Sequence, residues 1–278
     1  MREIGCSHVG DHVVTMPVGS FARKAVKAAV LPGGMITGRR PGDVVVLLYH
    51  RVVGGGGEID MPPGLFERQL EVMAAQDRVL TLDQAVAGDP EGGVVVSVDD
   101  GYRDFHDTVL PLLVRHRVPA VLYLATGLVA GEGDGPDDPD ALTWSQLAEA
   151  VATGLVTVGS HTHGHVDLAR APEQVCRDEM TRSRDLIEDR LGVACRHFAY
   201  PWAVGSPAAD RLARELFDSA ALDAWRTNRA GSTDPWRLGR TPLLASDGLA
   251  FFKAKLQGRL DGEALAYRLL GRGPWRRP

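Results

Sequence analysis

The chain has little cysteine, no long apolar run and no excess of basic residues. Its 278 residues include only Cys6, Cys176 and Cys195. An odd number of cysteines, mostly far apart, argues against a disulfide framework and indicates a reducing compartment. The 31 lysines and arginines are outnumbered by 36 aspartates and glutamates, which gives a net charge of −5. The chain therefore lacks the basic footprint of a nucleic-acid-binding protein, and we predict no nucleic-acid partner.

No apolar run approaches the length of a membrane span, so we predict no transmembrane segment. Residues 1–20 lack the basic start and the apolar stretch that are typical of a secretory signal. These absences together predict a cytoplasmic protein. No pattern in the chain indicates the oligomeric state.

Short apolar runs alternate along the chain with segments of helical periodicity. With 44% apolar residues, the chain can bury one sizeable core. Strands are predicted at Val44–His50, Val156–Ser160 and Leu238–Leu244, whereas Trp225–Trp236 has no regular pattern. Alternating strands and helices favour an α/β barrel. We divide the chain into an N-terminal extension over residues 1–42 and one barrel domain over residues 43–278.

The most informative stretch is Val94–Gly101, which reads Val-Val-Val-Ser-Val-Asp-Asp-Gly. Its valines predict a strand buried inside a parallel sheet, and ligands of α/β proteins bind where such strands end. Adjacent residues of a regular strand point to opposite faces. Before the flexible Gly101, however, Asp99 and Asp100 could both reach one cleft. Taken alone, the motif is more typical of a polar strand end followed by a turn.

A second predicted strand runs into His161-Thr162-His163-Gly164-His165. Two imidazoles and one carboxylate form a recognised catalytic zinc set that leaves a position open for water. His161 and His165 would supply the imidazoles, and either Asp99 or Asp100 the carboxylate. The other aspartate would then be available as a general base. A solvated loop with chance histidines is the alternative, but the two motifs together predict a metal-dependent hydrolase.

These residues carry a resemblance to the polysaccharide deacetylases, also called NodB-like or carbohydrate esterase family four. Ser97-Val98-Asp99-Asp100-Gly101 resembles the family's Thr-Phe-Asp-Asp-Gly motif, and the histidine cluster resembles its His-Ser/Thr-x-x-His motif. Two further stretches are similar to supporting motifs of the family: Phe198-Ala199-Tyr200-Pro201-Trp202 and Leu48-Tyr49-His50-Arg51-Val52. The resemblance extends over roughly residues 44–244.

The resemblance implies an irregular (β/α) barrel with seven or eight strands. It also implies that Asp100, His161 and His165 hold a divalent ion, usually zinc, while Asp99 acts as the general base. In relatives, the backbone amide of the residue aligned with Trp202 stabilises the tetrahedral oxyanion. The implied reaction is hydrolytic removal of an N-acetyl group from a glycan or amino-sugar conjugate, so a carbohydrate or amino-sugar substrate is the expected partner.

The chain departs from the family pattern at two positions that bear on catalysis. Ala199 stands where the family often has an arginine that orients the base, and Arg240 on a late strand is the candidate to replace it. No histidine follows His197, so the family's late histidine, a general acid, is missing. His50, at the end of the first strand, is the candidate for that role. A surface arginine and a packed histidine are the alternative readings of Arg240 and His50.

The third motif also differs where the substrate is expected. Trp202 and Ala203 replace the usual tyrosine and glycine, which indicates an altered subsite. We predict Tyr200 and Trp202 as substrate-binding residues. Two other functions stay open: an amide or imide hydrolase of the same fold that acts on a non-sugar metabolite, and a carbohydrate-binding relative with impaired catalysis.

Overall fold

A computed structural model describes residues 39–76, 78–129, 138–222 and 225–259, together with residues 25, 28 and 29. Most of the predicted extension over residues 1–42 and the end of the chain after residue 259 lie outside the described residues. The proposed division into an extension and a barrel domain therefore stays a prediction. Among the helices that the structure describes, none has the length and apolar character needed to cross a membrane.

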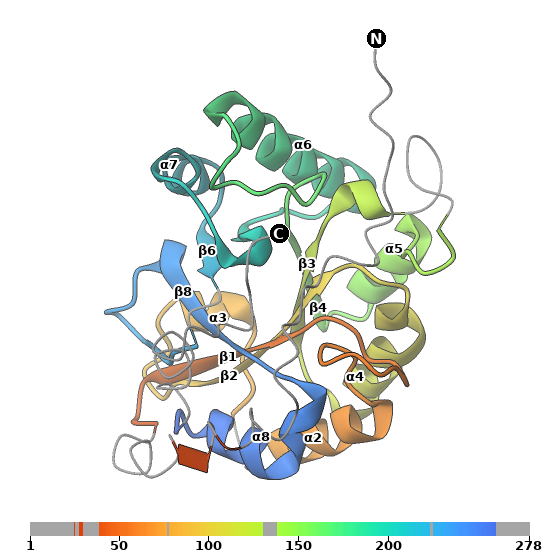
Figure 1. Ribbon diagram of the computed structural model, residues 1–278, viewed down its shortest axis with the longest axis vertical. Coiled ribbons are helices and arrows are strands. Elements are labelled where there is room, and N and C mark those ends of the chain that lie inside the picture. Colours follow the sequence, from red (N-terminus) through yellow and green to blue (C-terminus); the bar gives the residue numbers. More distant parts are fainter. Residues whose placement is uncertain are drawn as a thin grey trace.

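Within the described residues, seven parallel strands close into a barrel in the order β1-β2-β3-β4-β5-β6-β8. The predicted (β/α) barrel is confirmed (Figure 1). The strands are β1 (Asp43–Tyr49), β2 (Gly93–Asp100), β3 (Ala120–Leu124), β4 (Val156–Ser160), β5 (His197–Ala199), β6 (Ser219–Leu222) and β8 (Leu238–Pro242).

One strand was not predicted. The two-residue strand β7 (Asn228–Arg229) pairs antiparallel with the start of β1, inside the segment for which the sequence predicts no regular structure. Its pairing covers Asp43 and Val44, whereas β8 pairs with β1 only from Val46 onward. Two residues are too few to produce a recognisable alternation of apolar and polar positions.

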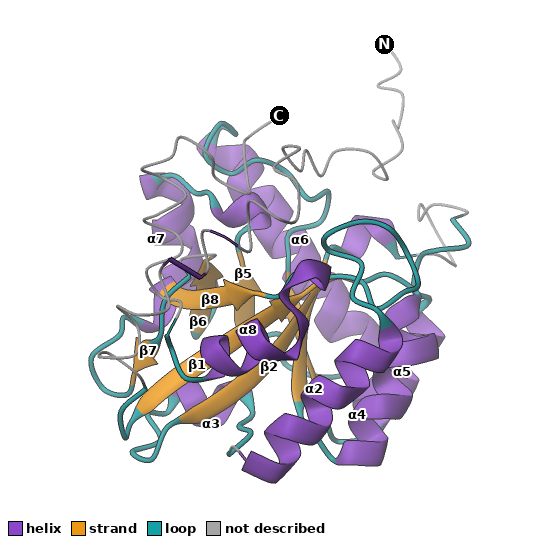
Figure 2. Cartoon of the chain, turned by 60° about the horizontal axis from the view of Figure 1, so that its bottom comes forward, coloured by secondary structure: helices purple, strands orange, loops and turns teal. Residues whose placement is uncertain are grey.

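Helices cover the outside of the barrel, as Figure 2 shows from another side. They are α2 (Pro63–Gln76), α4 (Leu110–His116), α5 (Trp144–Ala152), α6 (Glu173–Leu191), α7 (Pro207–Leu216) and α8 (Gly248–Leu256). The short helix α3 (Leu82–Val86) instead packs Leu82 against strand residues of the barrel interior. Capping boxes at Thr81 and Thr143 begin α3 and α5. A π-helical turn at Phe105–Val109 precedes α4.

Each strand places alternate residues on the two faces of the barrel wall, and the faces belong to two separate apolar clusters. In β2, Val94, Val96 and Val98 pack outward in the large cluster that includes helix residues such as Phe66. Val95 belongs to a smaller cluster inside the barrel. The two-residue period puts Asp99 on the inner side, with Val95. The inner cluster lies beneath the site formed by the polar strand ends.

Candidate metal centre

The end of β2 brings both aspartates of the Asp-Asp-Gly motif to the same place. Asp99 follows the alternation of the strand and points inward. The backbone of Asp100 has a φ of 77°, in the left-handed region that is uncommon for residues other than glycine. This break in the strand geometry redirects Asp100, which would otherwise point outward, toward the histidines that follow β4. Gly101, with a φ of 97°, continues the turn.

Asp100, His161 and His165 form one group in which each residue offers a ligand atom. The three atoms all lie within 4.8 Å of one another. Asp100 Oδ1 lies 3.6 Å from His161 Nε2 and 3.5 Å from His165 Nε2. Ligand atoms about 2.0–2.1 Å from a tetrahedral zinc ion would be about 3.3 Å apart. The spacing of the group therefore fits a single zinc-sized ion.

The histidines are held in the form that a metal ion requires. His161 Nδ1 donates a hydrogen bond to the carbonyl oxygen of Ala199 over 2.8 Å, which leaves the lone pair of Nε2 directed at the group. Burial lowers the pKa of His161 to about 3 and that of His165 to about 4, so both rings are neutral at pH 7. The rings of His165 and Trp202 meet edge to face, with centroids 4.4 Å apart.

Asp99 lies beside this group but is bound by an arginine from β8, which is separated from β2 by β1 alone. Arg240, on β8, donates from Nη1 to Asp99 Oδ1 over 2.6 Å. Asp99 Oδ2 lies 3.7 Å from His161 Nε2 and so faces the metal group. Both members of the pair are buried, with 1% of Arg240 and 2% of Asp99 exposed. Arg240 is therefore an interior residue, and the alternative of a surface arginine is excluded.

The surroundings of the two aspartates affect their pKa values in opposite directions. Burial is the largest single effect and opposes ionisation of Asp99, but the charge and the hydrogen bond of Arg240, together with smaller contributions from His161 and His50, outweigh it, and the pKa of Asp99 lies below its usual value. For Asp100, burial dominates and raises the pKa to about 6, although His50 acts in the opposite direction. A divalent cation beside Asp100 would favour its ionised form, as a metal ligand requires.

Of the remaining predicted residues, the structure places His50 and Trp202 near the site but Tyr200 away from it. His50 follows β1 and lies close enough for its charge to act on both aspartates. Trp202 lies at the site, and its φ of 50° is again left-handed. Tyr200 is not brought to the site: it is 1% exposed, and its hydroxyl donates to Asp210 Oδ1 over 2.9 Å. Tyr200 therefore supports the end of β5 against α7, in contrast to the predicted contact with a substrate.

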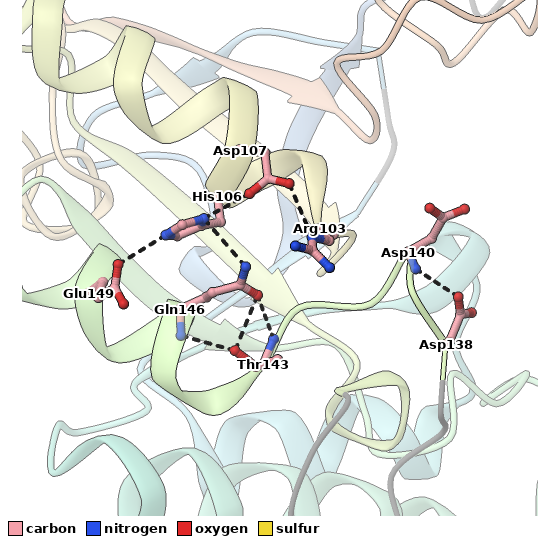
Figure 3. A network of polar contacts seen from close by, with 8 residues as sticks. All are labelled: Arg103, His106, Asp107, Asp138, Asp140, Thr143, Gln146 and Glu149. Carbon is pink, nitrogen blue, oxygen red and sulfur yellow. Dashed lines mark hydrogen bonds and ion pairs between the residues drawn. The ribbon is translucent and has the colours of Figure 1, made fainter.

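A polar network fixes the chain that follows Asp100. Gly101 accepts a backbone hydrogen bond from Leu142, and Arg103 donates its N–H to the carbonyl of Asp140. Figure 3 shows the side-chain part of this network, in which His106 lies between Asp107 and Glu149. These contacts connect the turn after β2 to the start of α5, so the position of Asp100 is supported by two elements.

A second group of possible ligands lies on the outside of the barrel. Glu67 and Glu71 on α2 approach His116 at the end of α4. Glu67 Oε1 is already hydrogen-bonded to Arg115 Nη1 over 2.5 Å, and Glu71 is exposed. A cation would have to displace the arginine. We therefore use this group only as a control for metal binding.

The polysaccharide deacetylase family model matches residues 87–217. This segment contains both aspartates and all three histidines of the motifs on which the resemblance rests. The resemblance to the polysaccharide deacetylases is confirmed. Arg240 and His50 lie outside the matched segment, so their positions come from the structure of this chain.

Individual proteins show the same similarity to deacetylases. The poly-beta-1,6-N-acetyl-D-glucosamine N-deacetylase of Staphylococcus aureus (strain MRSA252) is 23% identical over 153 residues, 50% of this chain and 52% of that protein. The Streptococcus pyogenes deacetylase PplD, solved with acetate, has a TM-score of 0.70 at 20% identity, and the match covers 78% of this chain and 100% of PplD. For IcaB from Ammonifex degensii the TM-score is 0.68 at 26% identity, with 79% and 98% covered. The chain spans about half the length of the curated relatives that it matches.

Proposed function

We propose that the protein is a zinc-dependent de-N-acetylase that removes N-acetyl groups from a glycan or amino-sugar conjugate. One observation carries the proposal: Asp100, His161 and His165 form a ligand group that fits one ion, beside a carboxylate, Asp99, that is held by an arginine. The similarity to deacetylases supports the choice of an acetamide as the bond that is hydrolysed.

In this proposal Asp100, His161 and His165 hold the ion. When bound, zinc polarises the acetamide carbonyl and lowers the pKa of water toward neutrality. Three protein ligands would leave the fourth position of a four-coordinate zinc ion for water or substrate. His161 keeps its orientation through the hydrogen bond to Ala199, so the lone pair of Nε2 stays directed at the ion.

Asp99 then acts as the general base. Its depressed pKa keeps it ionised at neutral pH, and Arg240 holds Oδ1, so that Oδ2 is the oxygen available to accept a proton from the attacking water. The oxygen of that water adds to the acetyl carbon, and the carbon–nitrogen bond breaks to give acetate and an amine. We assign to His50 the proton that the departing nitrogen requires, and to the backbone amide of Trp202 a hydrogen bond to the oxyanion.

Acetate release by the zinc-loaded protein tests this function. The substrate panel holds N-acetylglucosamine, chitooligosaccharides and oligomers of poly-beta-1,6-N-acetyl-D-glucosamine, the polymer for which the S. aureus relative is named. A simple aliphatic acetamide and a cyclic imide complete the panel. We expect acetate from at least one amino-sugar, and none after removal of the metal by a chelator.

Each outcome separates the proposed function from its alternatives. Metal without release of acetate from any sugar, but with cleavage of the imide or the simple amide, would instead support an amide hydrolase. Neither metal nor hydrolysis, with retained binding of the oligosaccharides, would support a carbohydrate-binding protein. Metal analysis should give about one ion per chain. His161→Ala or His165→Ala should lose that ion, whereas the control His116→Ala, in the outer group, should keep it.

A further inference from the structure

The arginine that binds Asp99 rests against an aromatic ring inside the barrel. The guanidinium carbon of Arg240 lies 5.3 Å from the centre of the Tyr123 ring. Tyr123 is fully buried, and Arg240 is 1% exposed. A cation over an aromatic face within about 6 Å is attracted by the ring quadrupole, and the attraction grows when water is excluded. Because both groups are shielded from water, the attraction between the guanidinium and the ring is stronger than it would be at the surface.

The strand register explains why the ring lies there. Tyr123 on β3 is the partner of Asp99 on β2 and of Gly159 on β4, so the three residues lie side by side across the wall. A Cβ atom at Gly159 would lie 2.8 Å from the carbonyl oxygen of His197 and 2.9 Å from Cδ1 of Tyr123, closer than such atoms approach. Glycine at this position therefore provides room for both that carbonyl group and the ring. Ala199 and Ala221 are small members of the same inner cluster.

The hydroxyl group of Tyr123 does not explain why a tyrosine stands at this position. In the described part of the chain, this buried oxygen has no hydrogen-bond partner. A buried hydroxyl without a partner is destabilising, so it contributes nothing that would favour tyrosine over phenylalanine. The ring, by contrast, is in contact with a buried cation. The function of Tyr123 is therefore to be sought in its ring.

We infer that the ring of Tyr123 is a positioning element of the site, which holds the guanidinium of Arg240 where Nη1 binds Asp99. The inference rests on the proposed function in one respect, the use of Asp99 as the base. Arginine is long and has many rotamers, and the face of the Tyr123 ring limits the positions that the guanidinium can take while Nη1 binds Asp99. Loss of the ring would let Arg240 move and would misplace Asp99 Oδ2, the oxygen that accepts the proton in the proposed reaction.

The first test compares two substitutions of the same residue. Tyr123→Leu removes the aromatic face, and we expect kcat to fall at least about tenfold with KM nearly unchanged and zinc retained. Tyr123→Phe keeps the face and should restore most of kcat. Leu80→Ala is the control for a general loss of packing, because Leu80 belongs to the same inner cluster but lies beside Gly93 at the start of β2. This variant should be destabilised yet keep its kcat.

The second test is a double-mutant cycle between Tyr123→Leu and Arg240→Ala. If the ring acts through the arginine, Tyr123→Leu should have little further effect on kcat once Arg240 is absent. The same cycle is measured by denaturant unfolding, which requires no activity, and it should show a coupling between the two positions.

Several results would overturn the inference. They are an unchanged kcat in Tyr123→Leu, a loss in Tyr123→Phe as large as that in Tyr123→Leu, and a coupling of zero in the unfolding cycle. A different result would count against the proposed function: coupling in the unfolding cycle together with an unchanged kcat in Arg240→Ala. In that case Tyr123 would hold an arginine that the reaction does not use.

Discussion

Removal of Arg240 is the perturbation whose size the structure predicts most directly. The Arg240–Asp99 pair has a nitrogen–oxygen distance of 2.6 Å, and its side chains are each 2% exposed. Arg240→Ala leaves the Asp99 carboxylate buried without this partner. Breaking a buried pair from one side is destabilising by about 3–5 kcal/mol, because an uncompensated charge remains in the interior. We expect a loss of that size in the free energy of unfolding of the metal-free protein at pH 7.

A surface pair on the same part of the chain provides a matched control. Arg237 and Asp210 are also 2.6 Å apart, but their side chains are 50% and 34% exposed. Arg237→Ala should therefore cost about 1 kcal/mol or less, since exposed pairs are screened by water. Both variants are measured by urea unfolding, and kcat is measured on the zinc-loaded proteins. Arg240→Ala should lower kcat far more than it weakens zinc binding. Equal and small losses of stability in the two variants would refute the buried, functional pair.

Three further expectations follow from single residues. Tyr200→Phe removes the hydrogen bond to Asp210 and should lower the free energy of unfolding by about 1 kcal/mol without raising KM. Trp202→Ala, in contrast, should raise KM when acetate release is measured. His197 is buried and its pKa is lowered from 6.5 by burial, so the unfolded chain takes up its proton first as the pH falls. The stability advantage of the wild type over His197→Gln should therefore shrink below about pH 6.5. An advantage that is constant or grows between pH 7 and pH 5 would contradict this sign.

Much of the site could be predicted because its residues follow strands in short motifs. The valines before Asp99 identify a buried strand, and three histidines at the end of another strand indicate ligands. Parallel strands end at one edge of the barrel, so the two motifs had to meet there. The prediction that both aspartates reach one cleft required a break in the alternation of the strand. The left-handed backbone of Asp100 is that break.

Other features could not be predicted, because they depend on contacts across the barrel. Tyr200 stands two residues before Trp202, and an unbroken alternation would place both on one face. The ring of Tyr200 packs against Phe198 in the large cluster, whereas the left-handed backbone of Trp202 brings its ring to His165. Tyr123 lies in an ordinary apolar strand, and no local pattern shows that Arg240 packs on its ring. The pairing of the large Tyr123 with Gly159 is a further indication, but it becomes visible only once the register of β3 and β4 is known.

The central claim is that Asp100 holds the ion while Asp99 moves the proton. Zinc content and acetate release of Asp99→Asn and Asp100→Asn, measured side by side, test it most directly. An amide cannot accept the proton, and general-base catalysis contributes roughly 10²–10⁴-fold. We predict that Asp99→Asn binds about one zinc ion per chain and loses nearly all activity, whereas Asp100→Asn binds zinc far more weakly. A zinc-free Asp99→Asn together with a fully loaded Asp100→Asn would contradict the account.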